Sequence, residues 1–256
     1  MASSDSAKEK LSGKVAVITG ASMGIGEAIV DLFVRQGAQV VLLSRDSGRL
    51  EAARARIGHL DQTLALACDV RHREEIDRVI GLIMHHFHRI DIWINNAGAD
   101  ILTGDAARLP FERKLQELLA VDLTATIRLS REVGGRMKSQ GHGVLLNMGW
   151  DQAETGMEGD SGQLFGSVKA GVIAFSKSLA LTLAPQVRVN CLAPGWIRTA
   201  WGTSASEHWQ ERVCQETPLD RWGTPEDVAA VARWLVSPAA AFITGQVIRV
   251  NGGAVR

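Results

Sequence analysis

The sequence contains no tyrosine, although seven tryptophans and six phenylalanines occur among its 256 residues. It also has no excess of charge, because 28 lysines and arginines balance 28 aspartates and glutamates. A neutral chain has no basic field that would attract nucleic acid or an anionic membrane, so we expect neither as a partner. The absence of tyrosine excludes every mechanism in which a tyrosine hydroxyl of this chain acts as the acid.

Cysteine and long apolar runs are also scarce. The three cysteines, Cys68, Cys191 and Cys214, are widely spaced, so they predict neither a disulfide framework nor a metal site. We therefore expect a reducing, cytoplasmic environment and no bound metal. The first fourteen residues are polar and lack an apolar leader, and no run approaches about 18 apolar residues, so we expect no membrane span.

Apolar β-branched runs alternate with helical patterns along the chain, and this alternation predicts a doubly wound parallel α/β sheet. The predicted strands cover residues 15–19, 39–44, 63–67, 90–94, 144–148, 187–192 and 246–250. Helices are predicted after the first strand and over residues 50–57, 74–86, 111–137, 163–183 and 225–236. A polar segment without a predicted helix leads from the strand at 187–192 to Pro218. No linker composition interrupts the chain, so we predict one domain over residues 1–256, with a flexible start at 1–10.

The stretch 14–26, KVAVITGASMGIG, joins the first strand to the first helix through Gly20, Gly24 and Gly26. Glycine adopts backbone angles that other residues avoid, and it lets a ligand approach the backbone closely. The start of the following helix offers free N–H groups and a partial positive charge, which suit a phosphate. Turns at Asp69, at 95–98 and at Pro194 also follow predicted strands, so all of them are expected at the sheet edge where ligands bind.

These motifs together resemble the short-chain dehydrogenase/reductase family over residues 11–253. Residues 19–26 match its TGxxxGIG loop, 95–98 match its NNAG turn, and Pro194-Gly195 with Thr199 match its segment beside the nicotinamide. Residues 221–227 and 251–253 are similar to its C-terminal region. The resemblance implies a three-layer, Rossmann-type fold with strand order 3-2-1-4-5-6-7, an NAD(P) cofactor and a homo-oligomer, either a tetramer or a dimer.

The resemblance also implies where the cofactor binds. The implied contacts are Gly20, Ser22, Met23, Gly24, Ile25, Gly26, Ser44, Arg45, Asp69, Val70, Asn96, Ala97, Gly98, Lys169, Pro194, Gly195, Ile197 and Thr199. An acid at the end of the second strand would favour NAD, but Ser44 stands there and Arg45 follows. A guanidinium suits a 2′-phosphate, so we predict NADP(H) in preference to NAD(H). The alternative is that Arg45 only pairs with Asp46.

The catalytic positions depart from the family pattern. In this family a Tyr-x-x-x-Lys pair transfers the proton, a serine orients the substrate oxygen, and an asparagine anchors a water. Lys169 matches the lysine, which places Phe165 at the tyrosine position. Asp122 stands at the asparagine position. General acid–base catalysis is worth about 10²–10⁴-fold, so ordinary carbonyl reduction is expected to be slow.

The serine position is also changed. In the stretch 147–150, NMGW, it corresponds to Trp150. The loop that follows is slightly longer than usual, so Asp151 or Gln152 could take the place instead.

Three hypotheses follow for the function. In the first, the chain is an oxidoreductase with a rebuilt acid, for which the candidates are Asp151, Glu154, Glu158, Asp160, Ser161 and Ser167; burial against Trp150 could raise a carboxyl pKa. In the second, Asp122 and Lys169 act through a water, as in the similar enoyl- and dienoyl-CoA reductases, unless Asp122 merely neutralises Lys169 or caps a helix. In the third, the chain is a non-catalytic NADP(H)-binding sensor or scaffold.

Tryptophans are concentrated in the segment that forms the substrate lid in this family. Trp196, Trp201 and Trp209, together with Trp150, could form an aromatic, apolar pocket for a bulky hydrophobic or planar substrate. The alternative is that they pack against the core or against another subunit. As a ligand we expect a small-molecule substrate or none.

Overall fold

The computed structural model describes residues 11–254 and contains a seven-stranded parallel sheet in the order β3-β2-β1-β4-β5-β6-β7. The strands are β1 (Val15–Thr19), β2 (Gln39–Ser44), β3 (Thr63–Ala67), β4 (Ile92–Asn95), β5 (Gly143–Met148), β6 (Val187–Pro194) and β7 (Val247–Val250). The predicted α/β class and strand order are therefore confirmed. The expectation of a flexible start at 1–10 lies outside the described residues.

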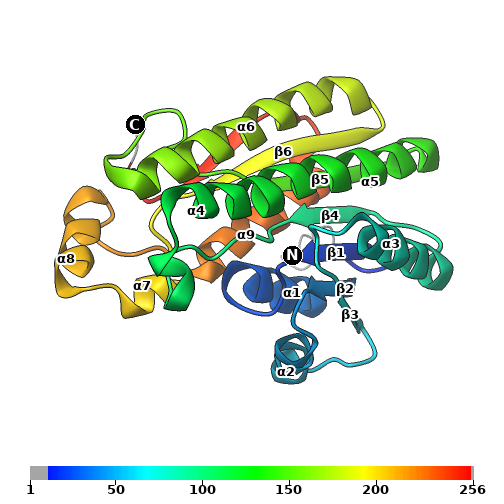
Figure 1. Cartoon of the computed structure of the whole chain (residues 1–256). Coiled ribbons are helices and arrows are strands. Elements are labelled where there is room, and N and C mark those ends of the chain that lie inside the picture. The colour runs from blue at the N-terminus through cyan, green and yellow to red at the C-terminus, as the bar shows by residue number, and fades with distance from the viewer. Residues whose placement is uncertain (1–10, 255–256) are drawn as a thin grey trace, which may run out of the picture.

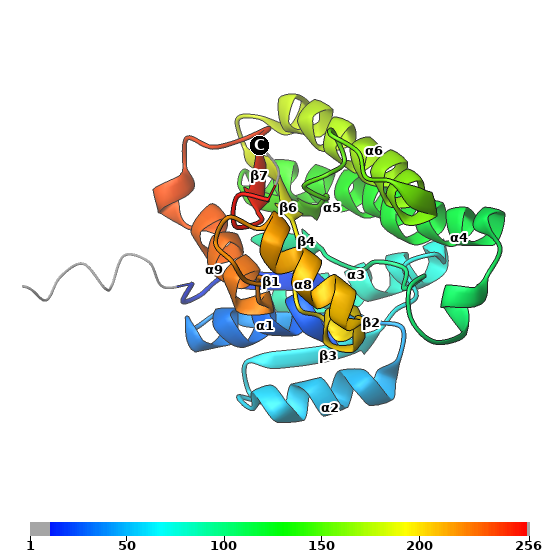
Figure 2. The same cartoon turned by 90° about the vertical axis from the view of Figure 1, so that its left-hand side faces the viewer.

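Helices cover both faces of the sheet and produce three layers (Figures 1 and 2). One face carries α1 (Gly24–Arg35), α2 (Ser47–Ile57) and α9 (Pro225–Val236). The other face carries α3 (Arg73–Phe87), α5 (Thr126–Gln140) and α6 (Gly159–Leu183), with α4 (Phe111–Leu118) beside α6. This arrangement leaves the carboxyl ends of the central strands free of covering helices.

Strand β1 shows how the apolar runs create two cores. Ala16 and Ile18 enter the core beneath α1 and α9, whereas Val17 enters the core beneath α3 and α5. Val17 is aligned with Val41 of β2 and Trp93 of β4, and all three side chains are fully buried in the same cluster. Alternate side chains of a strand point to opposite faces, so a strand buried on both faces needs a continuous apolar run.

Two expectations from the sequence were wrong in detail. The helix predicted over 111–137 is interrupted by a π-helical segment, Leu119–Ala125, between α4 and α5. The polar segment before Pro218 contains two helices, α7 (Ala200–Ser204) and α8 (Glu207–Glu216), which lie at the left of Figure 1. Short 3₁₀ turns occupy Gly104–Arg108 and Pro238–Ala240.

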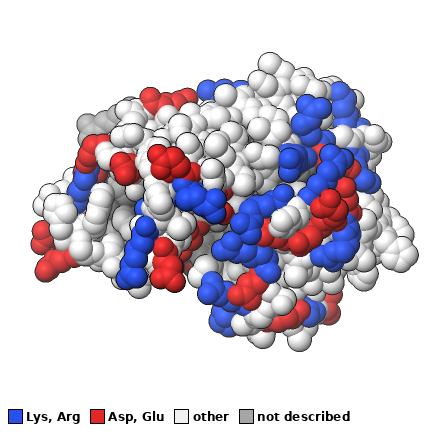
Figure 3. All heavy atoms as spheres, viewed as in Figure 1, with Lys and Arg blue, Asp and Glu red and all other residues white. Residues whose placement is uncertain are grey.

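Helix α6 has the length and apolar composition of a membrane span, with a mean hydropathy of 1.4 over its most apolar window. Ten of its 25 residues are buried, and it packs against β5, β6 and α5. In its most apolar window, 39% is buried inside the protein. Figure 3 shows acidic and basic side chains interspersed over the visible face, in keeping with the balanced composition.

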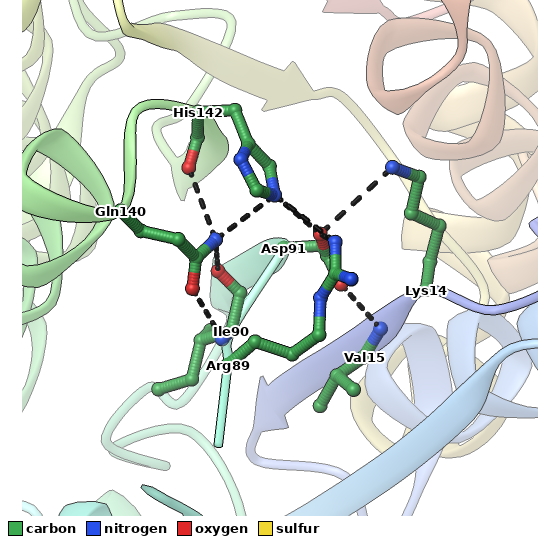
Figure 4. A network of polar contacts seen from close by, with 7 residues as sticks. All are labelled: Lys14, Val15, Arg89, Ile90, Asp91, Gln140 and His142. Atoms are coloured by element: carbon green, nitrogen blue, oxygen red, sulfur yellow. Dashed lines mark hydrogen bonds and ion pairs between the residues drawn. The ribbon is translucent and has the colours of Figure 1, made fainter. Parts of the chain in front are cut away.

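At the amino-terminal ends of the central strands lies a buried carboxylate, that of Asp91, which directly precedes β4 (Figure 4). One oxygen accepts the backbone N–H of Val15 at 2.9 Å. The other contacts the Arg89 guanidinium and lies 2.8 Å from Nε2 of His142, which directly precedes β5. Burial alone would raise the pKa of Asp91, but the hydrogen bonds from Arg89, Val15 and His142 outweigh it and hold that pKa below the usual range.

Replacing Asp91 by asparagine is expected to reduce the free energy of unfolding at pH 7 by about 1.5–3 kcal/mol, the usual worth of a hydrogen bond to a charged group. Because the folded-state pKa of Asp91 is lowered, its contribution is complete above the unfolded pKa, near 3.9, and is lost as pH falls through the folded value. The difference between the two proteins in urea unfolding should therefore be constant above about pH 5, shrink as pH falls through about 4, and disappear only below the folded-state pKa of Asp91.

Lys14→Met provides the matched control for this prediction. The Lys14 ammonium lies 3.8 Å from the same carboxylate, and 46% of its side chain is exposed. An exposed ion pair contributes less than about 1 kcal/mol. A Lys14→Met loss as large as that of Asp91→Asn would show that the network depends on net charge and not on the buried hydrogen bonds.

Candidate active site

A central cavity of about 610 Å³ lies at the carboxyl ends of the six strands β1 to β6. It runs from the glycine loop after β1 to the tryptophans around α7 and α8. Among the predicted cofactor residues, the cavity is lined by Gly20, Ser22, Met23, Gly24, Ile25, Ser44, Arg45, Asp69, Val70, Asn96, Ala97, Gly98, Lys169, Pro194, Gly195, Ile197 and Thr199. The predicted catalytic positions Asp122, Trp150 and Phe165 line it as well.

Gly26 is the predicted cofactor residue that does not line the cavity. A Cβ atom added there would lie 2.2 Å from the carbonyl oxygen of Gly20 and 2.6 Å from Nδ2 of Asn96. Its role is therefore close packing of α1 beneath the loop. Gly20, at φ +65°, allows a similar approach, because its Cβ would lie 2.8 Å from the Cα of Ala97.

Hydrogen bonds hold the glycine loop against the turn after β4. The Thr19 hydroxyl accepts the backbone N–H groups of Asn96 at 3.0 Å and of Ala97 at 2.9 Å. In return, Nδ2 of Asn96 donates to the carbonyl oxygens of Thr19 and Gly20, both at 3.1 Å. Helix α1 begins at Gly24 without a side-chain cap. Its first N–H groups therefore suit the phosphates of a dinucleotide.

At the end of β2, Ser44 Oγ lies 3.2 Å from Ser22 Oγ, and Arg45 lines the cavity. Asp46 caps α2 by accepting the N–H of Arg49 at 2.9 Å, and its carboxylate lies 3.3 Å from the Arg49 guanidinium. The structure thus pairs Asp46 with Arg49. Within residues 11–254, no carboxylate lies within 4.0 Å of the Arg45 guanidinium.

At the end of β3, Asp69 is bound by Arg71 at 2.6 Å. The hydrogen bond from Arg71 keeps the pKa of Asp69 below its usual range, despite partial burial. Cys68 also lines the cavity here, and burial raises the pKa of its thiol to about 11. Sequence reasoning did not single out Cys68 as a cavity residue, because a lone cysteine at a strand end carries no recognisable pattern.

The polar centre of the cavity is a direct ion pair. Lys169 Nζ lies 2.9 Å from Asp122 Oδ1 and donates to the carbonyl oxygen of Met148 at 3.0 Å. Asp122 is 2% exposed, and its other oxygen accepts the N–H of Ala99 at 2.8 Å. Asp122 lies in the π-helical segment, Leu119–Ala125, which has an extra residue in its helical turn. From there its carboxylate contacts Lys169 of α6. The expected proximity of Asp122 to Lys169 is seen in the structure without an intervening water.

Phe165 lies four residues before Lys169 on α6, so both point to the same side of the helix and line the cavity. Its ring packs edge-on against Trp150 with centroids 6.3 Å apart. Of the three residues considered for the serine position, Trp150 lines the cavity, whereas Asp151 and Gln152 are buried outside it.

Asp151 lies behind the cavity wall. It is 1% exposed, and Oδ2 accepts from Nδ2 of Asn251 at 3.1 Å. Burial raises its pKa to about 6, while the Asn251 hydrogen bond acts in the opposite direction. A Cβ on Gly195 would lie 2.8 Å from the same oxygen, so the Pro194-Gly195 turn separates Asp151 from the cavity. The raised pKa expected from burial is present, but Asp151 does not line the cavity.

The other candidate acids also lie away from the cavity. Glu154 pairs with Lys177 and Arg249, and Glu158 pairs with Arg212. Asp160 is exposed and outside the cavity lining, and Ser167 donates to carbonyl groups of its own helix. Only Ser161 of this set lines the cavity.

Four tryptophans around α7 and α8 form one cluster. Trp196, Trp201 and Trp209 line the cavity and pack on one another with centroids 5.4–6.0 Å apart. Trp222 is buried against Trp196 and Trp201 and does not line the cavity. The cluster therefore both anchors the α7–α8 segment and provides an aromatic wall. Sequence reasoning missed Asp100, Ile101, Leu102, Thr103 and Met157, which also line the cavity.

Comparisons with known proteins agree on one family. Residues 20–255 match the family model described as enoyl-(acyl carrier protein) reductase. The chain is 35% identical over 246 residues to a 3-oxoacyl-[acyl-carrier-protein] reductase of Vibrio cholerae, covering 95% of this chain and 98% of the relative.

Two solved structures are similar over nearly their whole lengths. A 3-ketoacyl-(acyl-carrier-protein) reductase from Brucella melitensis complexed with NADH has a TM-score of 0.86 at 30% identity, covering 96% of this chain and 100% of that one. A 7α-hydroxysteroid dehydrogenase complexed with NADH and 7-oxo glycochenodeoxycholic acid has a TM-score of 0.88 at 29% identity, covering 99% and 98%.

Proposed function

Because this chain belongs to the short-chain dehydrogenase/reductase family, we propose that it is an NADP(H)-dependent oxidoreductase with an altered proton-transfer site. The observation that carries the proposal is the buried Asp122–Lys169 pair, 2.9 Å apart, beside a phenyl ring at position 165. A dinucleotide site is preserved here, while the usual acid is absent. We propose further that the enzyme is cytoplasmic and forms a homo-oligomer, as do members of the family.

The residues of the cavity fit a dinucleotide. The start of α1 at Gly24 has no side-chain cap, which leaves backbone N–H groups for the pyrophosphate. Lys169, which is about nine-tenths buried, faces the cavity where it can hold the nicotinamide ribose. When bound, the cofactor supplies or accepts a hydride. The protein's part is to orient the substrate, to exclude water and to hold charge at Lys169 and Asp122.

The preference for NADP(H) rests on Ser44 and Arg45. The two similar structures hold NADH, so the preference must come from this chain's own residues. The last residue of β2 is Ser44 and not an acid, and the nearby carboxylate of Asp46 pairs with Arg49 and leaves Arg45 available. Its guanidinium suits a phosphate dianion.

Replacing Arg45 by alanine is expected to weaken NADPH binding by about 10–100-fold, since a hydrogen bond to a charged group is worth about 1.5–3 kcal/mol. NADH affinity should change by less than about threefold. Fluorescence titration with both cofactors measures this. Arg49→Ala is the matched control, because Arg49 lines the same cavity but already pairs with Asp46. Equal losses of affinity for NADPH and NADH in Arg45→Ala would contradict the assignment of the 2′-phosphate contact to Arg45.

A hydrophobic substrate is consistent with this site. The substrate end of the cavity is walled by Trp150, Phe165, Trp196, Trp201 and Trp209. Rings of this kind bury large apolar areas and favour planar or polycyclic ligands. One similar structure holds a bile-acid derivative, which supports a substrate of that size.

A second candidate is reduction of a conjugated C=C bond, with Asp122 and Lys169 acting through a water. It is favoured by the direct contact of these two groups and by the enoyl reductase description of the matching family model. A third, of a different class, is an NADP(H)-binding sensor or scaffold without turnover. The rates at which NADPH reduces a 3-oxoacyl thioester and the matching enoyl thioester distinguish these candidates. Faster reduction of the enoyl thioester favours the second candidate, and cofactor binding without turnover of any substrate favours the third.

A further inference from the structure

The substrate end of the cavity combines aromatic walls with compensated charge. Trp150, Trp196 and Trp201 line it. Lys169 and Asp122 are its ionised groups within the described residues, and at 2.9 Å they neutralise each other. The remaining acidic and basic lining residues are at the end of β2 and the start of α2, at the end of β3, and in the loop after β4: Arg45, Asp46, Arg49, Asp69 and Asp100.

A neutral Asp122–Lys169 pair between aromatic walls is poorly suited to carbonyl reduction. Hydride addition to a neutral carbonyl produces an alkoxide, which must be protonated or held by hydrogen-bond donors. Phe165, one helical turn before Lys169, has no hydrogen-bond donor in its side chain. The positive charge of Lys169 is compensated by the carboxylate of Asp122. At these two positions the site therefore provides less stabilisation for a developing negative charge than the family's tyrosine–lysine pair would, and Ser161 is the candidate acid left in the cavity lining.

We propose that the substrate of this enzyme is a preformed iminium cation, or the corresponding amine in the reverse direction. The inference rests on the proposed function, because it takes the nicotinamide cofactor as the hydride donor. Hydride addition forms a C–H bond at the iminium carbon, and the π pair of the C=N⁺ bond moves onto nitrogen. The iminium is reduced to a neutral amine, the dihydronicotinamide is oxidised, and no proton is gained or lost. An enzyme for this reaction needs no tyrosine.

The cavity walls suit such a cation. A positive group within about 6 Å of an aromatic ring centroid is attracted to its face, most strongly by tryptophan. The cluster already holds one cation outside the cavity, since Cζ of Arg212 lies 4.8 Å from the centroid of Trp209. The family's asparagine at position 122 would leave the Lys169 charge uncompensated and would repel the substrate. Aspartate removes that repulsion.

Steady-state reduction by NADPH of N-methyl-dihydroisoquinolinium and of tetralone, a neutral ketone of similar two-ring size, tests the proposal. Cofactor binding is first established by titration with NADPH. We expect the iminium to be reduced at least about 100-fold faster in kcat/KM than the ketone, the lower bound for a missing general acid. Deuterium from C4 of labelled NADPH should appear at the former iminium carbon, and reactions without enzyme give the background rate.

Binding provides a readout independent of turnover. The NADPH complex should bind N,N-dimethyl-tetrahydroisoquinolinium, a fixed cation with no reducible bond, about tenfold more tightly than its neutral carbon analogue dimethyltetralin, as measured by calorimetry. In Asp122→Asn this preference for the cation should disappear, because the positive charge of Lys169 is then uncompensated and repels the ligand. The asparagine amide oxygen can still accept the N–H of Ala99, so the fold should be retained, which circular dichroism verifies.

The outcomes separate the two proposals. If NADPH binds and the ketone is reduced as fast as the iminium, or the iminium is not reduced at all, the iminium inference is wrong while the cofactor assignment stands. A cation preference that survives in Asp122→Asn overturns the role given to the neutral pair. If NADPH does not bind, the proposed function fails and the inference fails with it.

Discussion

Phe165→Tyr combined with Trp150→Ser is expected to raise NADPH-dependent ketone reduction by about 10²–10⁴-fold in kcat/KM. At about 1.4 kcal/mol per factor of ten, this corresponds to roughly 3–5 kcal/mol of barrier. Both side chains line the cavity, and their rings are 6.3 Å apart. Tyrosine at 165 would place a hydroxyl one helical turn from Lys169, and serine at 150 would add a second donor. A coupled NADPH absorbance assay on tetralone measures the gain.

The geometry also predicts how this gain is limited. Lys169 lowers a neighbouring tyrosine pKa through its positive charge, and Asp122 cancels much of that charge at 2.9 Å. Adding Asp122→Asn should therefore raise ketone reduction further. Phe165→Leu with Trp150→Ser is the control, because it opens the same space without an acid. If the leucine variant gains as much as the tyrosine variant, the barrier is steric and the assignment of position 165 as the acid site is wrong.

Lys169→Met is expected to reduce the free energy of unfolding by about 3–5 kcal/mol, because it leaves the Asp122 carboxylate buried without its partner. Asp122 is 2% exposed, so its carboxylate depends on the ammonium and on the N–H of Ala99 for most of its polar contacts. Met148 also loses the donor to its carbonyl oxygen. Denaturant unfolding measures the loss. NADPH affinity should fall as well, since Lys169 is the cation assigned to the nicotinamide ribose.

Adding Asp122→Asn to Lys169→Met separates stability from function. Removing both charges of a buried pair is often nearly neutral for stability, so the double variant should recover most of the loss. Its NADPH affinity should remain low, because the cation is still missing. Complete recovery of NADPH binding in the double variant would contradict the role of Lys169 in the cofactor site. Failure to recover stability would show that the lysine stem, and not the ion pair, holds α6 to the sheet.

Much of the fold could be predicted because local patterns and topology agree. The alternation at Ala16, Val17 and Ile18 required a strand buried on both faces, and helices of ten or more residues between strands required parallel crossovers. The α7–α8 segment was missed for the opposite reason. Its helices are short and mostly polar on the outside, and they are anchored by tryptophans distant in sequence, such as Trp222. Tertiary packing, which sequence propensity does not record, stabilises them.

The π-helical segment, Leu119–Ala125, was missed because its apolar residues fit an ordinary helical period. An extra residue in a helical turn is stabilised by contacts formed elsewhere, here the ion pair to Lys169 and the N–H of Ala99. For the candidate acids between 151 and 160, the sequence left open whether they reach the site or form a solvated loop, and the exposure of Glu154, Glu158 and Asp160 agrees with the loop. A loop sequence does not determine which side of a strand end its carboxylates face.

The sequence by itself determined that the chain folds as a doubly wound α/β sheet, that it has a dinucleotide-type loop, and that no tyrosine acts as its acid. These properties follow from residue identity and local periodicity. Only the tertiary structure decided that Asp122 neutralises Lys169, that Asp151 lies behind the Pro194-Gly195 turn, and that three tryptophans from α7, α8 and the preceding turn line one cavity together with Phe165. Those properties depend on distances between residues remote in sequence, which are set by packing.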